Sequence, residues 1–146
     1  MAEQTSGEID IEASPEEVLD VVMDFGSYRE WAKGIKSTKV LRKDSKGRPS
    51  EVQIEAGQFG FNSKQTLKYS YRASNGGVSW KSTKCEGATK SVAGSYDLKE
   101  KDGATHVKYQ MKMELAMPVP GMVKRQAERM ITDSALKGLK KEVERR

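Results

Sequence analysis

The sequence has few of the side chains that covalent stabilisation and catalysis most often use. Its 146 residues include one cysteine, Cys85, and one histidine, His106. A single cysteine excludes an internal disulfide, and one cysteine with one histidine cannot supply the three or four ligands of a zinc site. Alternation places His106 on the polar face of its predicted strand. We therefore expect no catalytic histidine, no metal and no cofactor.

Long hydrophobic runs are also absent. No apolar segment approaches the roughly 20 residues that a membrane-spanning helix requires, and residues 1–8 are polar and acidic, unlike a secretory signal. These absences predict a cytoplasmic protein with no stable insertion into a membrane. Hydrophobic residues make up 36% of the chain and charged residues 32%, so a folded core requires apolar residues to be concentrated on defined faces.

The charge excess is basic, but both signs are mixed along the chain. Lys and Arg number 26 against 21 Asp and Glu, which gives a net charge of +5. An excess of this sign favours contact with nucleic acid or anionic membranes. Here, however, cations are interleaved with carboxylates, as in residues 99–102 and 140–142. We expect a solvated surface of mixed charge and no nucleic-acid partner.

The N-terminal segment predicts one strand followed by two short helices. Residues 8–13 alternate carboxylate and apolar side chains, the pattern of a strand with one buried face. Residues 14–17 (Ser-Pro-Glu-Glu) combine a capping box with a proline at the first helical position, which predicts a helix start. Residues 27–30 repeat the capping-box spacing and predict a second short helix.

From residue 35 onward apolar side chains recur at every second residue, the alternation of a β-strand. Asn75-Gly76 and Asp102-Gly103 are strong hairpin signals, because both central residues of a type I′ turn need positive φ. Short turns between successive strands predict an antiparallel meander, with the first strand pairing at one edge. The predicted strands, each with one apolar face, lie near residues 35–43, 50–57, 61–73, 77–85, 90–99 and 104–117.

A long helix is predicted at the C-terminal end. Pro118 and Pro120 end the last strand, and helical periodicity follows to about residue 144, a rod of roughly 39 Å. Its apolar residues recur every four positions: Val119, Val123, Ala127, Ile131, Ala135, Leu139 and Val143. The sequence thus predicts one α+β domain over residues 1–146. It comprises a seven-stranded curved antiparallel sheet, two short helices after the first strand, and a long C-terminal helix across the concave face.

Four stretches of the sequence resemble a known family. Together with the order of elements, they resemble the polyketide cyclase/dehydrase and lipid-transport family, within the START-like (SRPBCC) superfamily that also holds the birch-pollen-allergen type. The resemblance implies the helix-grip fold and a cavity between sheet and helix, lined by the inward faces. The matching stretches are residues 11–18 (IEASPEEV), 24–31 (DFGSYREW), 94–98 (GSYDL) and 135–140 (ALKGLK).

The inward faces and the resemblance together predict the ligand-binding residues. Methionine fills irregular gaps, so the methionines among them are either core filler or an adaptable lining. The inward hydroxyls and amides either satisfy one another or hold a ligand. We expect ligand contacts from Phe25, Trp31, Ile54, Phe61, Gln65, Leu67, Tyr69, Trp80, Ser82, Val92, Tyr96, Tyr109, Met111, Met113, Val123, Met130 and Ile131.

Three classes of function remain open at this point. The leading hypothesis is a non-enzymatic binder or carrier of a hydrophobic small molecule, such as a lipid, quinone or polyketide. The alternative is a polyketide aromatase/cyclase or dehydrase, with Tyr69, Tyr96 or Tyr109 assisting proton transfer; a tyrosine acts this way only if its surroundings retune its pKa. The third is an interaction module that uses its basic face. We expect a monomer or a weak homodimer.

Overall fold

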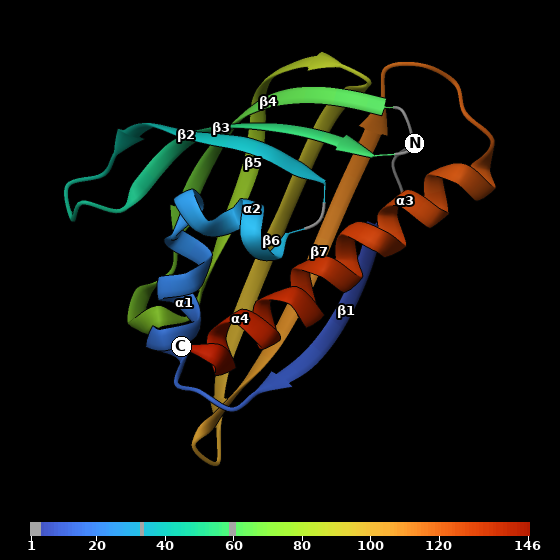
Figure 1. Ribbon diagram of the computed structural model, residues 1–146. Helices are drawn as coiled ribbons and strands as arrows, with labels where there is room; N and C mark the ends of the chain where they lie inside the picture. The colour runs from blue at the N-terminus through green and yellow to red at the C-terminus, as the bar shows by residue number, and fades with distance from the viewer. Residues whose placement is uncertain (1–3, 33, 59–60) are drawn as a thin grey trace.

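The computed structural model describes residues 4–32, 34–58 and 61–146. These residues form one seven-stranded antiparallel sheet in the order β1-β7-β6-β5-β4-β3-β2 (Figure 1). The meander is the predicted one, and the first strand pairs with its β7 edge as expected. The strands are β1 (Gln4–Ile11), β2 (Ile35–Lys43), β3 (Pro49–Gln58), β4 (Phe61–Tyr71), β5 (Gly77–Gly87), β6 (Thr89–Lys101) and β7 (Ala104–Leu115).

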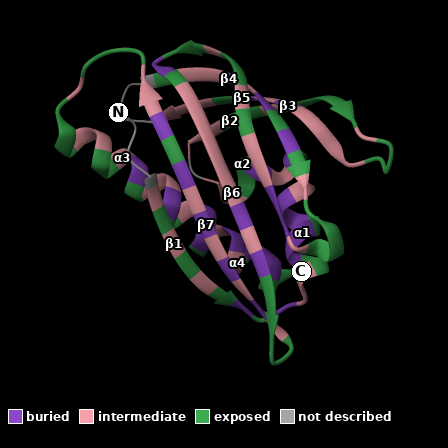
Figure 2. Cartoon of the chain, turned by 180° about the vertical axis from the view of Figure 1, so that it is seen from behind, coloured by how far each residue is buried: buried purple, intermediate pink, exposed green. Residues whose placement is uncertain are grey.

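The predicted alternation of the strands is confirmed by their burial. On β7, Val107, Tyr109, Met111 and Met113 are buried, and the residues between them are half-buried or exposed. Figure 2 shows the same banding along β6 and β7 from behind the sheet. The inner face therefore carries the apolar side chains, and the outer face meets solvent.

The start of the first strand differs from the sequence prediction. Strand β1 begins at Gln4 rather than near residue 8, because its backbone pairs with β7 as far as Lys112. Residues 5–7 (Thr-Ser-Gly) have no apolar alternation that would reveal this pairing. The β6–β7 hairpin follows the expected turn chemistry: Asp102 and Gly103 have φ of 51° and 83°. The prediction for Asn75-Gly76 was wrong, because the positive φ values there belong to Ser74 and Asn75, whereas Gly76 has φ of −74°.

The two short helices are present where they were predicted. Helix α1 (Pro15–Met23) begins with a complete capping box, in which Ser14 Oγ accepts from the backbone N–H of Glu17. A 3-10 turn (Phe25–Ser27) leads into α2 (Tyr28–Trp31). The second capping box was predicted wrongly: Ser27 makes no cap bond, because its hydroxyl donates instead to Asp24 Oδ2 at 2.9 Å.

The C-terminal helix is interrupted rather than continuous. It consists of α3 (Gly121–Asp133), a π-helical segment (Ser134–Gly138) and α4 (Leu139–Arg145). The predicted first ridge residue, Val119, precedes the helix. A single π turn inside an α-helix widens it locally and often occurs at functional sites. No helix in the described part of the chain is long and apolar enough to cross a membrane.

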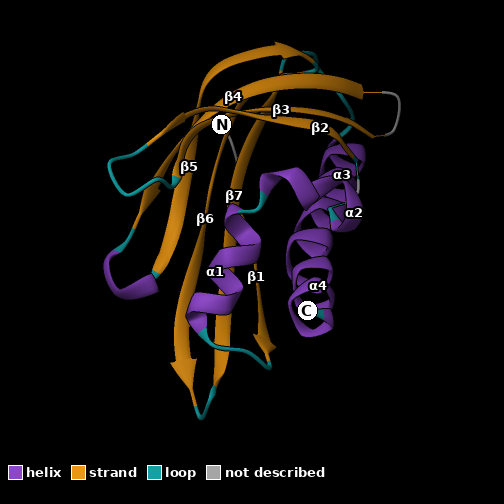
Figure 3. Cartoon of the chain, turned by 60° about the vertical axis from the view of Figure 1, so that its left-hand side comes forward, coloured by secondary structure: helices purple, strands orange, loops and turns teal. Residues whose placement is uncertain are grey.

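One part of the packed core lies where α1 and α4 meet on the sheet (Figure 3). Ile11, Val18 and Leu139 are fully buried there, and the hydroxyl of Thr105 fixes the β1–α1 connection by donating to Ala13 O at 2.7 Å. The second half of the apolar helix ridge, Leu139 and Val143, belongs to this core. The first half, on α3, faces a cavity.

Candidate ligand cavity

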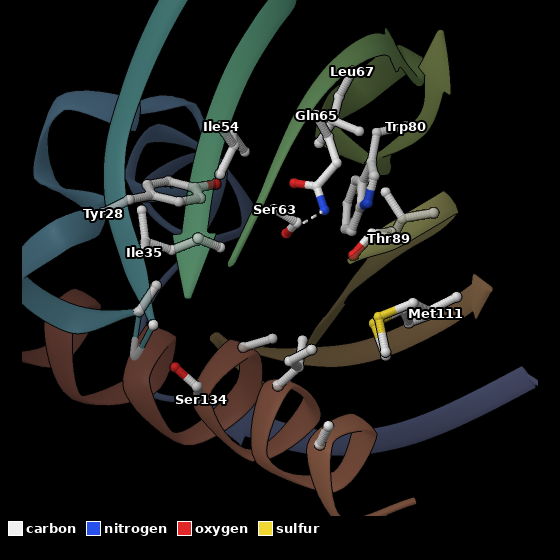
Figure 4. Close-up of a pocket in the computed structure, with 18 of the residues that line it drawn as sticks. Tyr28, Ile35, Ile54, Ser63, Gln65, Leu67, Trp80, Thr89, Met111 and Ser134 are labelled. Atoms are coloured by element: carbon white, nitrogen blue, oxygen red, sulfur yellow. Dashed lines mark hydrogen bonds between the residues drawn. The ribbon is translucent and has the colours of Figure 1, made fainter. Parts of the chain in front are cut away.

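A cavity of about 220 Å³ lies between α3 with its π-helical segment, helix α2 and the inner face of the sheet. Figure 4 shows side chains from the strands and from the helix converging on it. Most of the predicted ligand residues line it: Trp31, Ile54, Gln65, Leu67, Tyr69, Trp80, Val92, Tyr96, Tyr109, Met111, Met113, Val123 and Ile131.

Four predicted residues are not among the lining residues. Phe25 is 2% exposed and packs its ring into the core, 4.8 Å from that of Tyr28. Ser82 accepts a hydrogen bond from the backbone N–H of Val92, where the β5–β6 pairing has ended. Met130 lies about 100° around α3 from Ile131, off the face that lines the cavity. The side chain of Phe61 lies outside the described residues.

Other lining residues were missed by the sequence prediction. Tyr28, Ala32, Gly34 and Ile35 close the cavity from the α2–β2 connection, and Ala88 with Thr89 close it from the β5–β6 turn. These residues lie at the ends of helices and strands, where neither the two-residue period of a strand nor the 3.6-residue period of a helix applies. Only a tertiary arrangement brings them together, so no local sequence signal identifies them.

The lining side chains are less buried toward the end where α3 begins. Its inner side chains, such as Tyr96, Tyr109 and Ala135, are buried, whereas Leu115 and Val123 at the other end are only half-buried. We call this outer end the mouth. It is formed by the end of β7, the start of α3 and the facing ends of β2 and β3.

The cavity wall is strongly aromatic. The ring centroid of Trp80 lies 5.7 Å from Tyr69, 5.5 Å from Tyr96 and 5.9 Å from Tyr109. The indole of Trp80 lies over Gly94 on β6, where a Cβ would come within 2.6 Å of Trp80 Cζ2. Glycine at this position lets the indole lie against the sheet, which leaves the space above it open.

Polar groups form a small cluster on the sheet side of the cavity. Gln65 donates through Nε2 to Ser63 Oγ at 3.0 Å. Figure 4 shows its carbonyl oxygen and the hydroxyl of Thr89 directed toward the open interior. The amide orientation that makes this hydrogen bond leaves the Gln65 carbonyl oxygen as an acceptor for a ligand. The lining is otherwise mainly apolar, the usual composition of a small-molecule site.

A second polar group is buried beside the cavity, on helix α2. Trp31 Nε1 is buried and has no hydrogen-bond partner among the described residues. A buried donor left in this state costs about 1–3 kcal/mol. The Trp31 backbone is held close to the helix by Gly138, where a Cβ would come within 2.6 Å of Trp31 O. Trp31 therefore packs closely against the helix, and its indole N–H is enclosed by protein atoms and is not open to the cavity.

The buried tyrosines differ in their hydrogen bonding. Tyr96 donates to Ala135 O in the π-helical segment at 2.8 Å, and so links the sheet to the irregular part of the helix. No hydrogen bond from the hydroxyls of Tyr69 and Tyr109 occurs within the described ranges. Burial raises the pKa of Tyr69 and Tyr96 well above the ordinary value of 10.0, and it raises the pKa of Tyr109 as well. All three are neutral at physiological pH and are weak acids.

Comparison of the sequence with protein families gives one match. Residues 11–140 match the family described as polyketide cyclase/dehydrase and lipid transport. No curated protein matches the chain in sequence. The cavity lining and both close-packed glycines lie inside the matched range.

Several solved structures share the fold. A START superfamily protein from Mycobacterium smegmatis has a TM-score of 0.84 at 24% identity, with 97% of each chain covered. The Zhui aromatase/cyclase from a Streptomyces species has a TM-score of 0.83 at 13% identity, covering 100% of this chain and 96% of that one. A STAR-related lipid transfer protein from Xanthomonas axonopodis has a TM-score of 0.77 at 16% identity, with 97% and 85% covered. At these identities the likeness concerns the fold.

Proposed function

Because the chain belongs to the polyketide cyclase/dehydrase and lipid-transport family, we propose that it binds and carries a hydrophobic small molecule in the cavity between the sheet and α3. The observation that carries the proposal is an aromatic and apolar space of about 220 Å³ with few polar groups. Residues 1–146 then act as one ligand-binding domain. The aromatic wall around Trp80 favours a ligand with at least one flat ring, because ring faces in contact gain about 0.5–1.5 kcal/mol beyond burial.

The volume limits the size of the ligand. A dry engineered cavity of about 150 Å³ in another protein holds one benzene ring, so about 220 Å³ fits a compact ring system. A membrane phospholipid has two acyl chains, each about half of a ~30 Å hydrocarbon core in length. Such a lipid exceeds this cavity unless most of it remains outside. A quinone headgroup or a short cyclic polyketide fits better than a whole phospholipid.

The polar groups favour holding a ligand over transferring a proton. The tyrosines are weak acids, since burial raises their pKa values, and the hydroxyl of Tyr96 is already bonded to the helix. Gln65 and Thr89 present a neutral carbonyl oxygen and a neutral hydroxyl to the cavity. Such groups orient a ligand carbonyl or hydroxyl. Binding is therefore supported more strongly than the alternative aromatase/cyclase or dehydrase activity.

A ligand panel with a matched pair of variants tests the proposal. Ala127 lines the cavity from α3, and its neighbour Gln126 is exposed. Ala127→Phe places a ring in the cavity, whereas Gln126→Phe places the same ring in solvent. Quinones, cyclic polyketides and fatty acids are added to each protein while thermal unfolding is followed.

A ligand present at a hundred times its Kd stabilises the folded state by about 2.7 kcal/mol, which raises Tm by about 5–10 °C in a chain of this size. We expect that shift for wild type and Gln126→Phe with at least one ring compound, and its loss in Ala127→Phe. If no compound shifts wild type, or if Ala127→Phe responds as wild type does, the cavity is not the binding site.

A further inference from the structure

Two exposed methionines stand at the mouth of the cavity. Met117 lies in the connection between β7 and α3, and Met122 lies in the first turn of α3; they are 46% and 73% exposed. Their neighbours Leu115 and Val123 line the cavity. Large apolar side chains exposed to this degree are few in the described part of the chain, and the others, Val40 and Leu41, lie on β2.

The same end of the molecule carries lysines without ion pairs. The first or last four residues of the strands that end here, and of α3, contain Lys36, Lys64, Lys84, Lys90, Lys112 and Lys124, which we call the rim lysines. The corresponding carboxylates are fewer: Glu55, Glu86 and Glu114. None of the ion pairs found among the described residues involves a rim lysine.

The opposite end is different. There Arg145 and Arg146 bind Glu142, and Arg72 pairs with Asp97. Figure 1 shows the end of β3, the start of β4, the end of β7 and the start of α3 at one end of the molecule, with α1 and the C-terminus at the other. The mouth therefore carries six lysines against three carboxylates, a local excess of cations, although Lys43, Lys68, Lys99 and Lys101 at the other strand ends also make none of the ion pairs found among the described residues.

We propose that the mouth docks on an anionic lipid surface, with Met117 and Met122 entering the interface and the rim lysines contacting the headgroups. Apolar side chains flanked by cations are the composition of segments that lie in a membrane interface, and each Lys or Arg near an anionic surface contributes about fivefold in affinity, which corresponds to roughly 1 kcal/mol. Protruding, flexible methionines suit a fluid surface better than a shaped protein partner. An acidic protein is the other occupant that the charges would fit.

Docking in this position would bring the cavity opening to a source of hydrophobic ligand. That purpose rests on the proposed function, but the lipid binding itself does not. The two are therefore separable by experiment. Vesicle binding measures the docking surface alone, and the ligand-induced shift in Tm measures the cavity alone.

The test is co-sedimentation of the protein with vesicles of phosphatidylcholine, with and without phosphatidylglycerol. We expect binding to the anionic vesicles that weakens as salt is added, because exposed charges are screened beyond about 8 Å at physiological ionic strength. The double variant Met117→Ser/Met122→Ser is expected to bind about tenfold more weakly. Lys90→Gln with Lys112→Gln is expected to lose about 25-fold, fivefold for each cation.

The matched control is Val40→Ser/Leu41→Ser, which removes equally apolar, exposed side chains from β2, away from the mouth. It should bind as wild type does. The proposal is overturned if anionic vesicles fail to bind wild type at low salt. An acidic protein would then be the favoured partner of the rim lysines. It is also overturned if the β2 variant loses binding while the methionine variant keeps it. Ligand-induced shifts in Tm should persist in the methionine variant whichever result is found.

Discussion

Substitution of Gly94 by alanine tests whether the cavity depends on the flat packing of Trp80. Gly94 pairs with Trp80 across β5 and β6. A Cβ at residue 94 would lie 2.6 Å from Trp80 Cζ2 and 2.8 Å from Gln110 O. Real Cβ atoms do not approach other atoms this closely, so either the indole or the backbone has to move. The indole has free space on one side only, the cavity, and we expect it to tilt in that direction.

The magnitude follows from the cost of overpacking. One extra methyl group forced into a packed site destabilises a protein by about 1–3 kcal/mol, and in a chain of this length each kcal/mol lowers Tm by about 2–4 °C. We therefore expect Gly94→Ala to reduce Tm by roughly 2–12 °C. Because the tilted indole occupies part of about 220 Å³, ligand affinity should fall at least about tenfold, the equivalent of roughly 1.4 kcal/mol.

The assay combines thermal unfolding with tryptophan fluorescence, which reports the new indole environment. Gly26→Ala is the control, because a Cβ at residue 26 has its nearest neighbour, Asp24 Oδ1, at 3.9 Å. It should leave both Tm and ligand affinity unchanged. If Gly94→Ala unfolds at the wild-type temperature and binds ligand equally well, Trp80 does not form the cavity wall in the manner described.

Three further predictions concern single interactions. Tyr96→Phe should lower the free energy of unfolding by about 1–3 kcal/mol, since it leaves the carbonyl oxygen of Ala135 unpaired, whereas Tyr109→Phe should change it little; denaturant unfolding measures both. His106 hydrogen-bonds two carboxylates on β1, and these bonds raise its pKa above 6.5. Its stabilising effect should therefore be complete below about pH 6.5 and be lost as the pH rises through the raised pKa, so the Tm difference between wild type and His106→Gln should shrink toward alkaline pH. Ser14→Ala should cost about 1 kcal/mol by removing the cap of α1, and an unchanged unfolding midpoint would refute that role.

The fold could be predicted because each strand and helix carries its own periodicity. The alternation through Val107, Tyr109 and Met111 predicts which face is buried, and the ridge through Ala127 and Ile131 predicts the helix face above it. Both are local patterns that survive in the structure. The lining residues on these faces were accordingly predicted from the sequence.

Features that depend on distant connections and strand ends coming together in space could not be predicted from local patterns. Ile35 and Thr89 line the cavity only because two connections come together around it. The sequence of the π-helical segment predicts ordinary α-helix, because the spacing of the apolar residues Ala135 and Leu139 fits a continuous α-helix. The gathering of rim lysines around the mouth comes from strand ends far apart in sequence, where each lysine looks like an ordinary surface residue.

The central claim is that the cavity holds a hydrophobic small molecule, and native mass spectrometry of the purified protein tests it most directly. A wild-type sample is predicted to carry an additional noncovalent mass that organic solvent extracts as a compact ring compound, as should Gln126→Phe. The Ala127→Phe protein is predicted to be free of that mass. Wild-type protein with no extractable hydrophobic compound, even after incubation with the ring compounds of the panel, would contradict the account, as would equal retention by Ala127→Phe.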